Sequence, residues 1–322
     1  MIIKESGKEQ EVLTLEALGK RVAEHHPEKE NIQRDLKVKI AEIRGEKEIE
    51  YTLGFLDDKR YLILHNLRLR DQNGHFQIDT LLLSENYYLV VDAKNWQGTV
   101  VFGNNGQVTR IDLDGAEKGF QNPASQTKIQ SYRLHQWMIR NNFPNMFIEN
   151  LAVISFPKTI IKTSSPNITI PNEVIHNTDL LMRIKELERK HKKMLLPMNQ
   201  LMGIANTLKK AHEPLVRDIY STYQFSQKDL IKGVSCPECQ AIPMIRHKRN
   251  WYCRRCKTSC ADAHIRALND YLLLVGDRVS NREVREFLRV ESPDVVKRLM
   301  RNAGYQLIGS KKGSKYILKL RM

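Results

Sequence analysis

Apolar positions in the first fifty residues recur with the spacing of amphipathic helices. Between residues 9 and 23 they fall three or four apart, at Val12, Leu15, Leu18 and Val22. His26-Pro27 ends this helix, because the residue before a proline is disfavoured in helical geometry. A second helical pattern starts near Glu30 and continues toward residue 53. We therefore expect residues 1–44 to form a charged, helical segment.

Short apolar runs separated by turn signals follow, which is the pattern of a sheet. The predicted strands are residues 61–69, 76–83, 88–94, 99–102, 107–113 and 150–156. Asn-Gly pairs at 73–74 and 105–106 mark turns between them. A helix is expected from Asn122-Pro123 to Arg140. This order predicts an α/β fold for residues 45–175, with a mixed sheet flanked by helices.

The rest of the chain divides by composition into three parts. Residues 176–230 are polar and helix-rich, and we expect a helical connector there. Residues 231–261 contain the cysteines. In residues 262–322, helix signals include a capping box at Ser280 and the pair Ser292-Pro293, and two short strands flank a basic hairpin. Helices followed by such a hairpin predict a winged-helix-like module.

The positive charge of the chain is concentrated in its C-terminal part. The net charge is +15, and residues 231–322 carry 20 Lys and Arg against 8 Asp and Glu, which is +12 of that total. Such a concentration favours a polyanion partner, nucleic acid first of all, over a merely solubilising tail. No apolar run is long enough to cross a membrane, and no secretory signal is visible. We expect a cytoplasmic protein without membrane contact.

Charged residues interrupt two of the predicted core strands. Asp79 lies in one apolar run, and Asp92 and Lys94 lie in the next. A buried carboxylate is costly unless it is paired or binds a metal. Because Asp92 and Lys94 are two residues apart, they point to the same face of their strand. Two carboxylates and an ammonium suit a divalent cation and phosphodiester hydrolysis; a buried structural ion pair is the alternative.

Five short motifs occur in order around these residues: Gly45-Glu46-x-x-Ile49, His65-Asn66-Leu67, Gln77-Ile78-Asp79, Val91-Asp92-Ala93-Lys94-Asn95-Trp96-x-Gly98 and Asn122-Pro123-x-x-Gln126. Together they resemble the nuclease-related domain (NERD) family over about residues 40–160. That family is assigned to the PD-(D/E)xK superfamily, so the resemblance implies a restriction-endonuclease-like fold. Many members have Glu where this chain has Asp92.

The resemblance also implies a catalytic set. Asp79 and Asp92 would bind Mg²⁺ or Mn²⁺, and Lys94 would assist the attacking water. Glu46 would be a further carboxylate near the metal, although a solvated helix face is the plain alternative. Gln126 would line the site or be an ordinary helix residue. A fold that is intact but has lost its activity, and only binds, is a further alternative.

All five cysteines lie in one stretch of 25 residues. Cys236 with Cys239 and Cys253 with Cys256 form two C-x2-C pairs separated by 13 residues, which is the spacing of a zinc ribbon. Four thiolates make a closed structural site with no open position for catalysis. We expect Cys260 to be a free thiol, with a competing ligand as the alternative.

Basic residues in the ribbon and the C-terminal module are the candidates for nucleic-acid contact. They are Arg249, Arg254, Arg255, Lys297, Arg298, Arg301, Lys311 and Lys312. Basic side chains beside aromatic ones suit phosphate contact and base stacking. The third helix of the module would present its basic face to a groove. Zinc ribbons and three-helix modules also bind proteins, which is the alternative for this region.

These patterns predict a Mg²⁺-dependent DNA endonuclease or DNA-processing nuclease, anchored on DNA by its C-terminal modules. The alternative is a catalytically weak or inactive nucleic-acid-binding regulatory protein, and a third possibility is a protein-interaction adaptor. Metal-dependent cleavage separates the first from the second, and salt-dependent DNA affinity separates both from the third.

Overall fold

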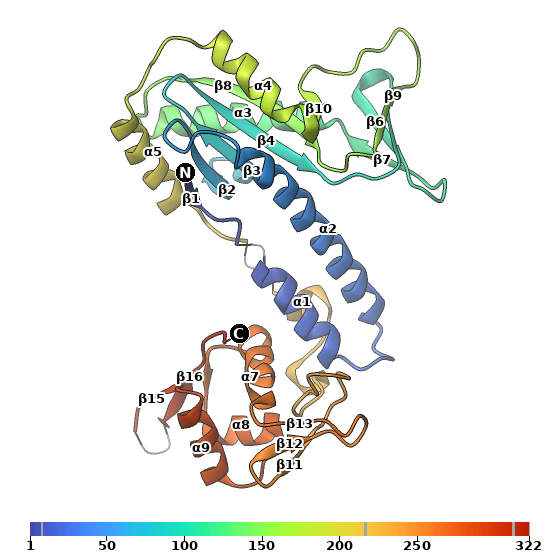
Figure 1. Cartoon of the computed structure of the whole chain (residues 1–322), viewed down its shortest axis with the longest axis vertical. Helices are drawn as coiled ribbons and strands as arrows, with labels where there is room; N and C mark the ends of the chain where they lie inside the picture. The colour runs from blue at the N-terminus through green and yellow to red at the C-terminus, as the bar shows by residue number, and fades with distance from the viewer. Residues whose placement is uncertain (8, 216–217, 311–312, 322) are drawn as a thin grey trace. The chain divides into compact units, whose positions relative to one another are not determined.

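The structure is a computed structural model that describes residues 1–7, 9–215, 218–310 and 313–321 (Figure 1). The chain divides into two units. The first combines Met1–Glu9 with Ile40–Val216, and the second combines Gln10–Lys39 with Arg217–Met322. The helix α2 (Lys29–Leu53) contributes residues to both. None of the described helices is long and apolar enough to cross a membrane.

A six-stranded mixed sheet forms the centre of the first unit (Figure 1). Its strands, in spatial order, are β1 (Ile2–Lys4), β2 (Leu62–Asp71), β3 (Gly74–Leu83), β4 (Tyr87–Lys94), β8 (Phe147–Ile154) and β10 (Val174–His176). The pairs from β2 to β4 are antiparallel, whereas β1 with β2, β4 with β8 and β8 with β10 are parallel. This confirms the predicted α/β class.

Helices cover both faces of this sheet. On one face, α3 (Pro123–Arg140) and α5 (Met198–Lys210) bury residues such as Leu134 and Leu201 against β2, β3 and β4. On the other face, the end of α2 and α4 (Asn177–Lys190) bury Ile49 and Ile184. The central strands are therefore buried on both sides, which explains their nearly continuous apolar sequence.

A second, four-stranded sheet belongs to the same unit. Its order is β7 (Glu117–Gln121), β6 (Gln107–Ile111), β5 (Thr99–Phe102) and β9 (Ile160–Thr163). Trp96 packs in the small core beneath it and contacts Phe120, with 5.1 Å between ring centroids. β6 and β7 lead directly into α3.

Several short strands differ from the sequence prediction. β1 lies within residues that we expected to be entirely helical, and β7, β9 and β10 were not expected. Each has three to five residues. Such segments are too short to show a two-residue period, and only tertiary pairing forms them.

In the second unit, α1 (Glu9–Arg21) and the beginning of α2 pack against the C-terminal third of the chain. Leu15, Leu18 and Ile32 share a core with Phe225 and Leu274. Arg21 is fully buried, and its Nε lies 2.8 Å from Asp270 Oδ2. This ion pair joins α1 to α7 (Ala263–Leu274).

The described residues from Ile245 onward form two small sheets and three helices. One sheet consists of β11 (Ile245–His247), β12 (Asn250–Tyr252) and β13 (Ser259–Cys260). The other consists of β14 (Arg278–Val279), β16 (Lys315–Ile317) and β15 (Gln306–Ile308), and it accompanies α7, α8 (Asn281–Leu288) and α9 (Pro293–Asn302). Helices followed by a hairpin give the winged-helix-like arrangement that we predicted; β14 was not expected.

Local cap signals located two of these helices correctly. The Ser280 side chain and Glu283 form a capping box at the start of α8. The Ser292 side chain accepts a hydrogen bond from the Val295 amide at the start of α9, where Pro293 is the first helical residue. Such caps depend on a few consecutive residues, so the sequence alone reveals them.

A glycine lets α2 approach the end of β4. A Cβ atom on Gly45 would lie 2.7 Å from Asn95 Cβ and 2.7 Å from Ser155 Oγ. The Asn95 amide nitrogen also donates to the Ala41 carbonyl, at 2.6 Å. The helix that carries Glu46 is therefore held tightly against the strand end that carries Lys94.

We expect Gly45→Ala to destabilise the protein by about 1–3 kcal/mol, because the added methyl group overpacks this contact. Gly203→Ala is the matched control, since a Cβ there meets nothing within 4 Å inside helix α5. The control should gain roughly 0.5–1 kcal/mol from helix propensity. Urea unfolding midpoints measure both, and equal gains in the two variants would contradict the close docking of α2.

Candidate functional site

The three charged residues of the two core strands meet between β3 and β4. These strands pair antiparallel, with Thr80 opposite Val91. The Asp79 carboxylate reaches across, and its Oδ2 accepts a hydrogen bond from the Ala93 amide at 3.1 Å. Because Ala93 lies between Asp92 and Lys94, all three side chains converge on the end of β4.

Asp92 is held by a network of polar groups inside the protein. Only 1% of its surface is exposed. Its Oδ2 lies 2.7 Å from Lys94 Nζ. The Gln126 amide bridges the pair, because its Oε1 accepts from Lys94 at 2.9 Å and its Nε2 donates to Asp92 Oδ1 at 3.3 Å. Gln126 lies in the first turn of α3, which begins at the Asn122 cap.

Burial dominates the electrostatics of this site. It raises the pKa of Asp92 from its ordinary value of 3.8 to about 6. The positive charge of Lys94 opposes this rise, and the neighbouring Asp79 carboxylate adds to it. The pair is thus not a well-compensated ion pair, because the ionised form of Asp92 costs free energy in the folded protein.

A second glutamine also contacts Asp92, and sequence reasoning missed it. Gln130 follows Gln126 by one helical turn on α3, and its side-chain hydrogen bond lowers the pKa of Asp92. Its Oε1 atom is buried and has no hydrogen-bond partner among the described residues. The i, i+4 spacing from Gln126 was the signal that could have identified it.

Glu46 belongs to helix α2. Its Oε2 accepts a hydrogen bond from Ser6 Oγ at 3.3 Å. Gly45 places this part of α2 against Asn95, one residue after Lys94. Gln77 lies two residues before Asp79 on β3, opposite Arg68 of β2. The structure therefore brings Asp79, Asp92, Lys94 and Gln126 together, whereas Glu46 lies on the helix that approaches Asn95 and contacts Ser6.

The donor set fits a hard divalent cation. Two carboxylates converge, and the charge of one raises the pKa of the other. A cation between them would relieve this repulsion and the cost of burial, and oxygen ligands are those that Mg²⁺ and Mn²⁺ prefer. The residues present are thus compatible with such an ion.

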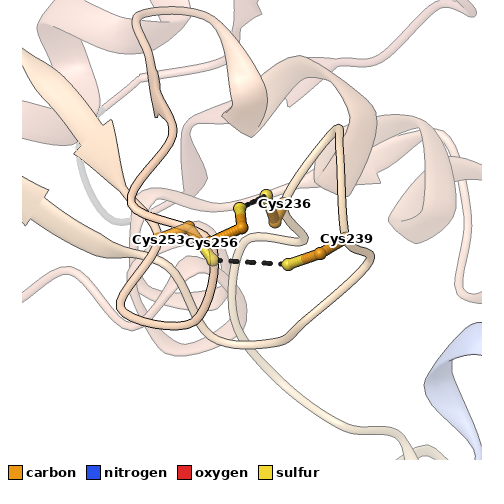
Figure 2. A group of neighbouring side chains, drawn as sticks. All are labelled: Cys236, Cys239, Cys253 and Cys256. Carbon is orange, nitrogen blue, oxygen red and sulfur yellow. Dashed lines mark hydrogen bonds between the residues drawn. The ribbon is translucent and has the colours of Figure 1, made fainter.

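Four cysteines of the second unit form a separate metal-ligating cluster (Figure 2). The sulfur atoms of Cys236, Cys239, Cys253 and Cys256 all lie within 4.8 Å of one another. Four sulfurs at a Zn–S distance of about 2.3 Å in a tetrahedron would be roughly 3.8 Å apart. The cluster therefore has suitable ligands and dimensions for a metal ion.

The two cysteine pairs have the same backbone geometry. In the first, the Gln240 amide donates to the Cys236 carbonyl at 3.1 Å; in the second, the Lys257 amide donates to the Cys253 carbonyl at 2.9 Å. Gln240 and Lys257 both have positive φ, at 60° and 65°. Cys260 is outside the cluster, and its thiol donates to Asp262 Oδ1 at 2.9 Å.

The structure describes six of the eight residues that were predicted to contact nucleic acid. Six of them are exposed: Arg249, Arg254, Arg255, Lys297, Arg298 and Arg301. The last three lie on α9, where Lys297 also approaches Asp294 at 3.3 Å. Lys311 and Lys312 lie outside the described residues.

Comparison with known proteins identifies the domain that contains the carboxylates. The model of the nuclease-related domain matches residues 41–155. An uncharacterized protein of Bacillus anthracis is 29% identical over 101 residues, which are 31% of this chain and 47% of that protein. The chain thus matches about half the length of this relative. No solved structure matches the chain significantly. The domain match indicates a nuclease-related function.

We expect Asp92→Asn to stabilise the metal-free protein by roughly 3 kcal/mol at pH 7.5. The folded-state pKa of about 6 lies above the ordinary value of 3.8, so ionised Asp92 lowers stability above pH 6, and this penalty disappears below pH 4. Unfolding in EDTA at pH 7.5 and at a pH below 4 measures the difference in stability between the variant and the wild-type protein.

The two explanations of Asp92 predict opposite signs in this experiment. If Asp92 and Lys94 are a structural ion pair, removal of one charge should destabilise the fold by about 3–5 kcal/mol at neutral pH. If Asp92→Asn is less stable than the wild type at pH 7.5, ionised Asp92 does not reduce stability. The explanation of Asp92 as a functional carboxylate kept at a cost to stability would then be wrong. Glu149→Gln, which removes a carboxylate bound to Lys190 and His191, is the control expected to destabilise.

Proposed function

We propose that the chain is a metal-dependent nuclease that hydrolyses phosphodiester bonds, with DNA as its substrate. The observation that carries this proposal is the convergence of Asp79, Asp92 and Lys94 at the end of β4, inside the region that matches the nuclease-related domain. The raised pKa of Asp92 supports it, because a carboxylate maintained at a cost to stability is typical of functional sites.

Asp79 and Asp92 would hold Mg²⁺ or Mn²⁺. When bound, such an ion neutralises charge on phosphate oxygens and activates a water. Burial and the neighbouring Asp79 charge disfavour the ionised form of Asp92, so a cation between the two carboxylates would offset both effects.

Lys94 would position the attacking water or a phosphate oxygen. Its ammonium has three donors, and two are directed to Asp92 and to Gln126 Oε1. The remaining donor can bind a water at the reacting phosphate. Gln126 and Gln130 keep Asp92 in place by donating to it, and Glu46 would be a further carboxylate of the site.

The second unit would bind the nucleic acid. In this proposal Cys236, Cys239, Cys253 and Cys256 hold one structural Zn²⁺, and the ribbon together with the winged-helix-like module contacts DNA. The net charge of +12 after residue 230 and the six exposed basic residues support electrostatic binding to phosphates.

We expect the full chain to cleave DNA in Mg²⁺ or Mn²⁺ and not in EDTA. Asp79→Asn, Asp92→Ala and Lys94→Gln should each lower the cleavage rate by at least about 100-fold. The same variants should bind DNA nearly as the wild type does, because the binding charge lies after residue 230. A panel of DNA and RNA forms, analysed on gels and by anisotropy, measures both properties.

Two outcomes would count against this assignment. Equal cleavage by Asp92→Ala and wild-type protein would show that the nuclease activity comes from elsewhere. Binding to DNA without cleavage in any metal would favour the alternative, a nucleic-acid-binding regulatory protein with an inactive domain. Glu149→Gln serves as the control, since Glu149 pairs with Lys190 and His191 outside the site.

We also expect one tightly held zinc per chain. Cys256→Ser should lose it, whereas Cys260→Ser should keep it, because Cys260 lies outside the cluster and contacts Asp262. Elemental analysis of protein purified without chelators measures the content. Zinc loss from Cys260→Ser, or a zinc-free wild type, would contradict the ligand assignment.

A further inference from the structure

The sheet of the first unit loses its regular alternation at one point of two neighbouring strands. Leu64 and Leu67 of β2 both lie in the core formed with α3 and α5, and so do Ile78 and Leu81 of β3. Residues three apart in a regular strand point to opposite faces of the sheet. Each strand therefore contains one residue in excess between these positions, as at a β-bulge.

The register of the two strands places this irregularity at Asn66 and Asp79. It pairs every residue of β2 except Asn66, and it passes over Asp79 on the opposite strand. Asn66 has a φ of 49°, in the left-handed region that few residues other than glycine and asparagine adopt. The register of β3 with β4 ends at Thr80. Asp79 therefore lies where the regular pairing of β3 with β2 is interrupted and its pairing with β4 ends.

The interruption matches the unusual direction of the Asp79 side chain. Side chains of a regular strand stand roughly perpendicular to the sheet. The Asp79 carboxylate instead reaches sideways, to the backbone amide of Ala93 on β4 at 3.1 Å. This direction keeps the carboxylate beside Asp92, whose pKa rises with the charge of Asp79. A regular β3 would direct Asp79 away from the plane of the sheet and weaken this convergence.

Residues of β1 and of the segment after it hold Asn66 in its conformation. The Lys4 ammonium donates to the carbonyl of His65 at 2.9 Å and to that of Asn66 at 3.1 Å. The Asn66 side-chain amide donates to the Ser6 carbonyl at 2.9 Å, and the Ser6 hydroxyl donates to Glu46 at 3.3 Å. Strained backbone of this kind persists only where its surroundings fix it, and it is concentrated at functional sites.

We propose that Asn66 is a positioning residue of the carboxylate site. Its left-handed conformation interrupts the β2–β3 ladder opposite Asp79, so that Asp79 is directed at the end of β4, and its contact with Ser6 connects Glu46 to the same point. This inference rests on the proposed function, because it takes the carboxylates to be metal ligands. It goes further by giving a role to the motif His65-Asn66-Leu67, which the proposed chemistry does not involve.

The test compares two substitutions of Asn66 in the full chain by calorimetric titration with Mn²⁺. Asn66→Val should weaken Mn²⁺ binding roughly 10- to 100-fold, because a β-branched residue disfavours the left-handed region and the orientation of a metal ligand is lost. Asn66→Gly should bind within a few fold of the wild type, since glycine adopts that region without steric cost. Asp79→Asn, which removes a proposed ligand, should abolish the binding. DNA affinity, measured by anisotropy, should be unchanged in all three variants.

Asn142→Val is the matched control. Asn142 is also left-handed, with a φ of 57°, but it is exposed beyond the end of α3. Its replacement should lower the melting temperature as Asn66→Val does and leave the Mn²⁺ affinity unchanged. If Asn66→Val does not fold, Lys4→Met replaces it, because it removes the donor to both carbonyls and leaves β2 intact. Lys4→Met should weaken Mn²⁺ binding by about 10-fold, and unchanged binding would contradict the role of Asn66.

The outcomes separate this inference from the proposed function. If the wild type binds Mn²⁺ and Asn66→Val loses no more affinity than Asn142→Val, or if Asn66→Gly loses as much as Asn66→Val, the positioning role alone is wrong. If the wild type does not bind Mn²⁺, or if Asp79→Asn binds it equally well, the proposed function is wrong and this role with it. A loss in Asn66→Val that Asn66→Gly and Asn142→Val do not share establishes the positioning role.

Discussion

The carboxylate of Asp92, buried in a sheet with helices on both faces, constrains the elements of the first unit that surround it. Lys94 must be two residues away to reach it from the same strand face, and α3 must begin where Gln126 can bridge the pair. The Asn122 cap and Pro123 determine that beginning. Even with these partners, burial raises the pKa of Asp92 to about 6. The network therefore orients the carboxylate without fully compensating its charge, which distinguishes it from an exposed ion pair such as Lys297–Asp294.

A different buried ion pair organises the second unit. Arg21 of α1 contacts Asp270 of α7 and donates to the carbonyls of Ile231 and Gly233, at 2.8 and 3.0 Å. Burial lowers the pKa of Arg21 and raises that of Asp270, and their attraction opposes both shifts. Loss of either partner would leave the other charge buried without compensation. As a consequence, removal of residues 231–322 would also remove the surface that α1 packs against, so single substitutions test the C-terminal modules more cleanly than truncation.

The features that could be predicted from the sequence depend on residues that lie close together along the chain. The helix starts at Ser280 and Ser292 follow from cap residues within one turn, and the cysteine cluster follows from two equal spacings. The same-face pair Asp92 and Lys94 follows from the two-residue period of a strand. The strand β1, by contrast, exists because Ile2 pairs with Ile63, and Arg21 meets Asp270 across 249 residues of sequence. No local sequence pattern indicates these long-range contacts. Gln130 is an intermediate case, since the helix was predicted and its period would have led from Gln126 to it.

The cost of ionising Asp92 separates the explanations of the charged group in the first unit. Burial and the neighbouring Asp79 charge both oppose ionisation of Asp92, and Lys94 compensates them only in part. Folding alone selects against this arrangement, because apolar substitutions of similar volume would avoid the penalty. A divalent cation bound between the two carboxylates would remove it. The penalty is therefore a feature that metal binding would explain and that a purely structural ion pair would not.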